Sequence, residues 1–592
     1  MRNTSVTLKS TASNELNWNS INWFHISKYV ETMQQRIYRA EILGNKRKVR
    51  DLQRILVHSN AMLLAAIKRV TQVNRGKRTS GVDGMIVKTA AERWQLYQQI
   101  REMRLEQHHP KPSYRTYIKK KNGKLRPLSI PTIRDRIYQF IIKSALEPQW
   151  EARFEPCSYG FRPERGCHDA IQRIVVSTQK GGKRWIFEGD FKGCFDNLNH
   201  EYILNKIGDF PYKNLIKKWL KAGYVDNGVF NETDTGSGQG NIVSPLLANI
   251  ALMGMEEALG IRYRAQYKNG KYAGHTNETA YTLSFYADDF VVVCKTREDA
   301  EAVYDKLKPY LTARGLELSE EKTRIVNISE GFNFLGFNIR MFTTWYGEIL
   351  LTRPSKETMK KSREKIREIF QKCNGRKTDD LIRQMNPVII GLAGYWSPFN
   401  SKQAFKETDA YIWKKTVKYL KRCHHNKGIK WIWKKYFAPD KTGQSKSRWI
   451  LTAPDTGNQL KYMAWIPIIR HPLIKHCASP YNEALKEYFE ERHRREFRRN
   501  TVGSRQKLAN MQKYRCPLCK QSITDFTEKL VTQLKIPETD GGKYEYKNIE
   551  LVHYKCGQCW KSYKKRREEI ADASNRKECE KEIRQLRLAG SI

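Results

Sequence analysis

Long hydrophobic runs are absent from this chain of 592 residues. No apolar stretch approaches the roughly 18 residues that suggest a membrane span. The first residues also lack the apolar core of a secretory signal. A basic start with Ser and Thr leaves an organellar transit peptide as the weaker alternative, which Glu15 opposes. We therefore expect no membrane partner.

Acidic residues are scarce relative to basic ones. The chain has 108 Lys and Arg against 62 Asp and Glu, a formal net charge of +46. Such an excess predicts binding to a polyanion through phosphate neutralisation and counterion release. Thirty Tyr and 14 Trp add rings on which unpaired bases can stack. The composition favours a nucleic-acid partner, and the length predicts several domains because one core does not grow this large.

Two adjacent carboxylates, Asp288 and Asp289, interrupt an apolar run. Strand-forming residues flank them on both sides, which predicts a β-hairpin with the pair at or near its turn. Neighbouring like charges in apolar surroundings repel each other unless a cation lies between them. An Asp-rich turn without a ligand is the alternative. Asp190 ends another strand-like run and favours the metal site, because three carboxylates on neighbouring strands can hold two Mg²⁺ ions for phosphoryl transfer.

This arrangement resembles the palm of reverse transcriptases, with Tyr286-Ala-Asp-Asp289 as the signature box of that family. The resemblance implies that catalysis and the binding of two Mg²⁺ ions belong to Asp190, Asp288 and Asp289. It also implies that Phe195 is the steric gate, a ring placed where the 2′-hydroxyl of a ribonucleotide would lie. We interpret the nearby Glu188 and Asp196 as structural.

A basic hairpin upstream of the palm is expected to contact the incoming nucleotide. Asn122-Gly123 is a strong hairpin signal, and it places basic side chains on neighbouring strand ends. In the family this hairpin grips the dNTP, which implies that role for Lys124 and Arg126. Contact with template phosphates alone is the alternative.

A glycine-rich segment at 236–241 precedes an apolar helix and lets backbone amides approach an anionic ligand. The resemblance places Gln239 and Gly240 in the nucleotide pocket. The family usually has Pro and Gly where this chain has Gly238 and Asn241. This departure predicts a looser loop or an altered fidelity, but it removes no metal ligand.

Residues beyond the palm resemble the thumb of group II intron maturases. Residues 356–372 predict a basic amphipathic helix, and Asn386-Pro387 predicts a helix break. The resemblance implies several partners: the intron RNA that the protein helps to splice, target DNA and dNTPs. It also implies a ribonucleoprotein particle in the bacterial cytoplasm, associated with the nucleoid.

A basic run at 492–499 lies in a segment where we expect DNA binding. Charge runs are usually solvated faces. The polyanion interpretation is favoured here because a nucleic-acid enzyme precedes the run.

Four of the 12 cysteines form two close pairs near the C-terminus. In a reducing compartment this spacing predicts one structural Zn²⁺ with four thiolate ligands, Cys516, Cys519, Cys556 and Cys559. The frame resembles the HNH endonuclease of many intron proteins. Gln533, Leu534 and Trp560 stand where that family has histidines, and none of them can activate water or hold the catalytic metal. We predict a zinc-stabilised DNA-binding remnant without second-strand cleavage.

Together these patterns predict an α+β multidomain fold: right-hand polymerase fingers and palm, an α-helical thumb (maturase domain X), a DNA-binding region and a small zinc-bound ββα-like C-terminal domain. The predicted boundaries are 1–85 for a basic helical extension, 86–345 for fingers and palm, 346–437 for the thumb, 438–505 for DNA binding and 506–592 for the degenerate HNH-like domain. The predicted function is that of an RNA-directed DNA polymerase and maturase that copies its intron during retrohoming. The alternative is a non-mobile RNA-binding splicing factor with the same fold.

Overall fold

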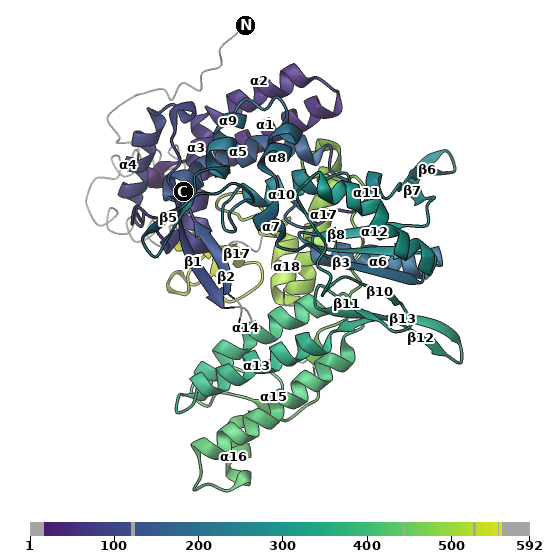
Figure 1. Ribbon diagram of the computed structural model, residues 1–592. Coiled ribbons are helices and arrows are strands. Elements are labelled where there is room, and N and C mark those ends of the chain that lie inside the picture. The colour runs from purple at the N-terminus through teal and green to yellow at the C-terminus, as the bar shows by residue number, and fades with distance from the viewer. Residues whose placement is uncertain are drawn as a thin grey trace, which may run out of the picture. The chain divides into compact units, whose positions relative to one another are not determined.

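A computed structural model describes residues 17–558, apart from 120–122, 124, 442–444, 502, 525–528 and 555. It contains two compact units (Figure 1). The first unit consists of Met1–Arg153, Phe195–Ala251 and Ser479–Ile592, and the second consists of Phe154–Cys194 and Leu252–Ala478. The predicted segment 438–505 is therefore divided between the two units. Lys124, Cys559 and Trp560 lie outside the described residues.

The second unit is built around a four-stranded antiparallel sheet with the order β10-β3-β9-β8. Its strands are β3 (Trp185–Asp190), β8 (Thr282–Tyr286), β9 (Asp289–Cys294) and β10 (Arg324–Asn327). Helix α6 (Cys167–Gly181) packs against β8, and α12 (Arg297–Thr312) packs against β3 and β9. Phe187 and Phe290 stack at the centre of the sheet with ring centroids 6.1 Å apart. This packing fixes the strand ends where the carboxylates lie.

Two further sheets of the second unit are hairpin-like. One is the pair β6 (Tyr263–Lys268) and β7 (Lys271–Asn277). The other has the order β11-β12-β13, with the strands β11 (Phe332–Phe334), β12 (Phe337–Thr344) and β13 (Gly347–Pro354).

The thumb region of the second unit is helical, as the sequence predicts. Its helices are α13 (Lys356–Lys372), α14 (Thr378–Trp396), α15 (Lys402–Cys423) and α16 (Ile429–Tyr436). The predicted break at Asn386-Pro387 is wrong, because α14 continues through Pro387. Pro387 lies on the exposed side of α14, while Met385 and Ile389 are buried. Burial of the apolar side outweighs the one backbone hydrogen bond that proline removes.

The first unit combines N-terminal helices with a small mixed sheet. The helices before the sheet are α1 (Trp23–Ile42), α2 (Lys46–Val57), α3 (Asn60–Lys68) and α4 (Ala90–Arg101), and α5 (Ile133–Glu151) follows its first two strands. The sheet has the order β2-β1-β4-β5, with β1 (Ser113–Lys119), β2 (Leu125–Ile130), β4 (Tyr224–Asp226) and β5 (Val229–Asn231). Helices α8 (His200–Ile207), α9 (Lys213–Leu220) and α10 (Ser244–Leu252) complete this part.

The C-terminal part of the first unit contains α17 (Lys486–Asn500), α18 (Gly503–Met511) and the hairpin of β16 (Leu530–Leu534) and β17 (Ile549–His553). The basic run at 492–499 lies on α17, where Arg494, Arg495 and Arg498 form ion pairs with Glu490 or Glu491 of the same helix. Part of its charge is thus balanced locally. None of the helices in the described residues combines the length and apolar character that a membrane crossing needs.

Candidate active site and metal centre

Two of the three predicted catalytic carboxylates lie opposite each other on neighbouring strands. Asp190 ends β3 and is the register partner of Asp289, which begins β9. Asp289 also pairs with Tyr286 of β8, so Ala287 and Asp288 form the turn of the β8–β9 hairpin. The structure therefore places Asp190, Asp288 and Asp289 at one end of the sheet. This is the hairpin that the apolar flanks of the pair predict.

The segment 157–160 supports this turn through backbone contacts. Ala287 has a φ of +59°, in the left-handed region of the backbone that residues with a Cβ rarely adopt. Neighbouring contacts must therefore hold the turn in this conformation. Tyr159 donates its backbone N–H to the carbonyl of Phe285 at 2.9 Å, and Phe285 donates to Cys157 at 3.0 Å. A Cβ on Gly160 would lie 2.2 Å from the backbone nitrogen of Ala287, so only glycine permits this approach.

Arg162 has a structural role in this support. Its guanidinium is buried and donates to the carbonyls of Glu155 at 2.7 Å and Ser158 at 3.0 Å. Both of these contacts are to backbone carbonyls close by in the chain, which favours a structural role over a contact with phosphate.

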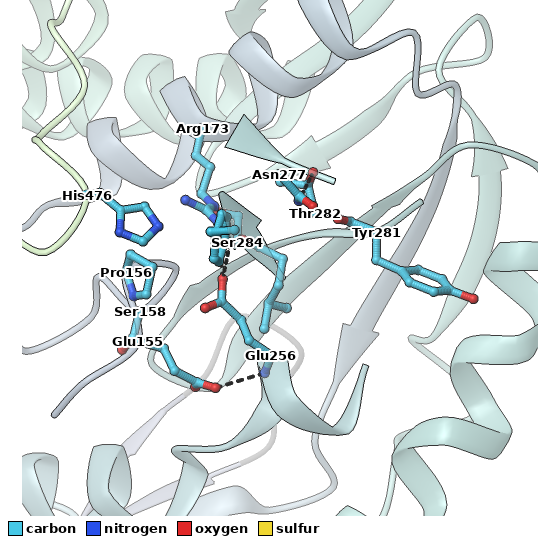
Figure 2. Close-up of polar contacts among 12 residues, drawn as sticks. Glu155, Pro156, Ser158, Arg173, Glu256, Asn277, Tyr281, Thr282, Ser284 and His476 are labelled. Atoms are coloured by element: carbon cyan, nitrogen blue, oxygen red, sulfur yellow. Dashed lines mark hydrogen bonds and ion pairs between the residues drawn. The ribbon is translucent and has the colours of Figure 1, made fainter. Parts of the chain in front are cut away.

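A buried polar network ties β8 to helix α6 (Figure 2). Arg173 of α6 donates to the carbonyl of Leu283 at 2.7 Å and to the Glu256 carboxylate at 3.1 Å. Ser284 of β8 donates its hydroxyl to the carbonyl of Ala170 at 2.8 Å. Glu155 accepts the backbone N–H of Glu256 at 2.9 Å, and burial with the nearby Glu256 raises the pKa of Glu155 to about 7. The strand that leads into Asp288 is thereby anchored by hydrogen bonds inside the second unit.

The three carboxylates carry more negative charge than the neighbouring cationic groups balance. Desolvation, followed by repulsion from Asp288 and Asp190, raises the pKa of Asp289 to about 6, although its side chain remains open to solvent. Lys322 contacts the Asp190 carboxylate, and this hydrogen bond raises the pKa of Lys322. Glu188 is paired with Arg324 at 2.6 Å, which agrees with its structural interpretation. One ammonium group balances only part of three negative charges, so the oxygen donors are suited to divalent cations.

Phe195, one of the predicted nucleotide-binding residues, lines a pocket of about 360 Å³ in the first unit. Its lining includes the Phe195 ring, Ser129 of β2, and Gly238 and Asn241 of the glycine-rich loop. Gln239 accepts the backbone N–H of Ser129 at 2.6 Å. Gly240 lies against the same residue with a φ of +118°, and a Cβ there would lie 2.3 Å from the carbonyl oxygen of Ser129.

Arg126 has no such place in the pocket lining. It is exposed on β2 and pairs in register with Ile118 of β1.

Two residues that line this pocket each have a buried polar atom without a hydrogen-bond partner among the described residues. Ser237 Oγ and Asn241 Oδ1 are buried, and within the described part of the chain neither has a hydrogen-bond partner. Buried polar atoms without partners are costly, and a ligand that reached them would satisfy the missing contacts. The pocket is therefore suited to a polar ligand.

The C-terminal hairpin carries a second candidate metal site. The ligand atoms of Cys516, Cys519, His553 and Cys556 all lie within 4.8 Å of one another. Three thiols and one imidazole form a donor set that suits a tetrahedral metal. The structure thus brings together three of the four predicted cysteines and adds His553, which the sequence analysis did not assign to the metal.

His553 is held in a ligand-like orientation at the end of β17. Its Nε2 lies 3.1 Å from the carbonyl of Ser522, so Nδ1 faces the thiols and lies 3.2 Å from the Cys519 sulfur. Such a contact fixes the tautomer and ring plane of a metal-bound histidine. The spacing of His553 from Cys556, two intervening residues, is the sequence signal that indicates this ligand.

Gln533 lies across the same hairpin from Glu550 and donates to its carboxylate at 2.7 Å. Asn548 holds the preceding loop, since its side chain accepts the backbone N–H of Ile536 and donates to the carbonyl of the same residue, both at 2.9 Å. Both residues are engaged in structural contacts.

Comparison with known proteins places these features in a family. A model described as reverse transcriptase (RNA-dependent DNA polymerase) matches residues 118–339, and one for the N-terminal domain of reverse transcriptase matches 18–100. The maturase-specific domain of group II introns matches 359–437.

Individual relatives agree with these matches. Protein YkfC of Escherichia coli is 36% identical over 313 residues, which cover 48% of this chain and 82% of YkfC. The group II intron-encoded protein LtrA of Lactococcus lactis is 34% identical over 321 residues, 45% of this chain and 53% of LtrA. A 91 kDa protein in the cob intron of Schizosaccharomyces pombe is 28% identical over 379 residues, 53% of this chain and 46% of that protein. The chain thus spans about half the length of the last two.

Proposed function

The chain belongs to the family of group II intron-encoded reverse transcriptases and maturases, and on that premise we propose that it copies its intron RNA into DNA at the β8–β9 hairpin during retrohoming. The observation that carries this proposal is the register pairing of Asp190 with Asp289 beside Asp288. The three carboxylates would hold two Mg²⁺ ions. When bound, these ions would supply charge neutralisation for the attacking and leaving oxygens of nucleotide transfer.

The pocket of the first unit would hold the incoming dNTP. Phe195 would exclude a ribose 2′-hydroxyl by its bulk, and the backbone of Gln239 and Gly240 would hold Ser129 in the pocket wall. The contact of Arg126 and Lys124 with the triphosphate rests on the family resemblance, because Arg126 does not line this pocket and Lys124 lies outside the described residues. Primer extension would then depend both on the residues that bind and orient the nucleotide and on the carboxylates that hold the metal ions.

Zn²⁺ is the metal that we propose for Cys516, Cys519, His553 and Cys556. Thiolate and imidazole donors favour this ion over Mg²⁺, and a site closed by four protein ligands is structural. The sequence predicts Cys559, which lies outside the described residues, as the fourth ligand in place of His553. An X-ray absorption spectrum of the purified zinc protein distinguishes three sulfur ligands from four.

We also propose that the C-terminal domain contacts target DNA without cutting it. Gln533 and Asn548 are engaged in structural contacts, and neither side chain is an imidazole. The particle would act in the bacterial cytoplasm at the nucleoid, with a DNA end supplied by replication as primer. Clean second-strand cleavage in a nicking assay over a range of Mg²⁺ and Mn²⁺ concentrations would contradict this part.

The decisive experiment compares primer extension on an RNA template with splicing of the intron RNA. We expect the wild type to support both reactions, and Asp288→Ala/Asp289→Ala to abolish extension while leaving splicing intact. Asp305→Asn on α12 is a matched control, because it removes an exposed carboxylate that is not part of the β8–β9 hairpin. Splicing without any extension by the wild type would instead favour the non-mobile splicing factor.

A further inference from the structure

The β12–β13 hairpin presents one buried and one open face. Alternate residues of its register pairs point to opposite faces. Ile339, Met341, Leu350 and Thr352 share a face and are buried. The opposite face carries Arg340 and Phe342 on β12 and Arg353 and Ile349 on β13, of which Arg340, Arg353 and Ile349 are exposed. The hairpin runs outward from the other elements of its unit in Figure 1.

Two guanidinium groups flank an aromatic ring on the open face. The Phe342 ring has Arg340 at 5.0 Å and Arg353 at 5.6 Å from its centroid. In the described part of the chain neither arginine forms an ion pair, although Arg340 donates to the carbonyl of Ser329 at 2.9 Å. The positive charge of this face is therefore not balanced by protein carboxylates.

The tip of the hairpin is made of two exposed aromatic residues. Trp345 is 86% exposed and Tyr346 is 75% exposed, and their ring centroids lie 3.4 Å apart with an angle of 31° between the planes. Tight hairpin turns usually have Asn, Asp or Gly at these positions. Two large rings at a turn expose apolar area without contributing to a core, which is typical of a contact surface.

We propose that this face and tip bind unpaired nucleotides of the intron RNA by base stacking, with Arg340 and Arg353 neutralising adjacent phosphates. Aromatic rings interleaved with arginines are the combination that binds single strands, because every base offers a π-face and every linkage a negative charge. The reverse transcriptase match ends at residue 339 and the maturase match begins at 359, so neither assigns a role to this surface. The inference rests on the proposed intron-RNA binding of the chain.

The first test maps the contact directly. Intron RNA substituted with 4-thiouridine is crosslinked to the full-length protein, and the modified peptides are identified by mass spectrometry. We expect a crosslink within 340–353. Crosslinks found only elsewhere in the chain would overturn the proposal.

The second test measures the contribution of the rings. We expect Trp345→Ala/Tyr346→Ala to weaken the binding of an unpaired oligoribonucleotide of about 12 nucleotides by roughly tenfold, the scale of one or two lost base stacks. Fully paired RNA of the same length should bind the variant and the wild type equally. Tyr267→Ala is the matched control, because Tyr267 is 69% exposed on the separate β6–β7 hairpin.

The third test concerns the charges. Arg353→Gln should reduce the slope of log affinity against log salt by about 0.7 for the single strand. Equal affinity of Trp345→Ala/Tyr346→Ala and of the Tyr267→Ala control for the single strand would overturn the ring contact. Intact primer extension and splicing by the same variant would show that the proposed function stands. A wild type that binds no RNA would overturn both proposals.

Discussion

The two candidate metal sites both lie at the ends of antiparallel hairpins, yet they differ in donor and exposure. At the β8–β9 hairpin the donors are carboxylate oxygens, and Asp289 remains open to solvent. At the β16–β17 hairpin the donors are sulfur and imidazole, and Cys516 and His553 are buried. Hard oxygen donors on an open edge leave ligand positions for a substrate, whereas three thiolates and one imidazole fill all four positions of a tetrahedral metal.

This difference separates a site that does chemistry from a site that holds a fold. Cys516 belongs to a small core with Phe497, Leu508, Leu551 and Val552, so the second metal would tie together the elements around it. The carboxylates contribute no such packing, because like charges at a strand end oppose folding until a cation arrives. Loss of a ligand should therefore affect activity at one site and stability at the other.

The largest effect is expected at Asp289. Asp289→Asn should reduce primer extension by at least roughly 100-fold, since even residues behind metal ligands cost 10- to 100-fold when they are changed. Its melting temperature should not fall, because the substitution removes a like charge from beside Asp190 and Asp288. Single-turnover extension and thermal unfolding measure the two quantities. A variant that keeps its activity, or that loses activity only by unfolding, would contradict the assignment of catalysis to the carboxylate site and of stability to the C-terminal site.

Cys516→Ser should show the opposite pattern. We expect loss of bound zinc and rapid proteolysis of the region around residues 503–558, because structural zinc contributes directly to folding. Primer extension on a preformed template and primer should stay within about threefold of the wild type. Metal analysis and limited proteolysis report the first effect. Cys373→Ser, a buried cysteine of the thumb helices outside the cluster, controls for the loss of any buried thiol.

Much of the carboxylate site follows from local sequence patterns. The apolar flanks of Asp288 and Asp289 predict the hairpin, and the matching run before Asp190 predicts its neighbouring strand. The support beneath the turn does not follow from such patterns. Gly160 and Arg173 act through contacts with residues more than one hundred positions away, and periodicity contains no information on those pairings.

At the C-terminal site, too, the sequence pattern predicts only part of the arrangement. Spacing identifies Cys516, Cys519 and Cys556 as ligands, but the orientation of His553 depends on the carbonyl of Ser522. The continuous helix through Pro387 has a similar cause. The burial of Met385 and Ile389 stabilises the helix by more than the low helix propensity of proline destabilises it.

A smaller effect is expected from pH at the open site. The pKa of Asp289 is raised from 3.8 to about 6, so between these values the folded protein binds more protons than the unfolded chain. Its contribution to the free energy of unfolding therefore falls as pH rises through this window and is constant above it. Mg²⁺ competes with the same proton, so the Mg²⁺ concentration for half-maximal extension should rise as pH falls below about 6. An unchanged Mg²⁺ requirement at low pH would contradict this assignment, and Asp305→Asn should follow the wild type.

The smallest effect concerns the two departures from the family pattern in the nucleotide loop, Gly238 and Asn241. A Cβ on Gly238 would lie 3.1 Å from the Asn241 amide nitrogen and 3.0 Å from Ser129 Oγ. The Asn241 side chain thus occupies space that a larger residue at 238 would need, so the two departures compensate each other. We expect Gly238→Pro alone to raise KM for dNTP, and Asn241→Gly to relieve part of that increase in the double variant.

The coupling between the two positions should be about 1 kcal/mol, or roughly fivefold in KM, as is usual for residues in contact. Asn227→Gly is the control, because Asn227 lies at the turn between β4 and β5 with a φ of +48° and does not line the pocket. Paired with Gly238→Pro, it should show no coupling. Additive effects of Gly238→Pro and Asn241→Gly would mean that the two departures arose independently, and that the pocket around Phe195 tolerates either without the other.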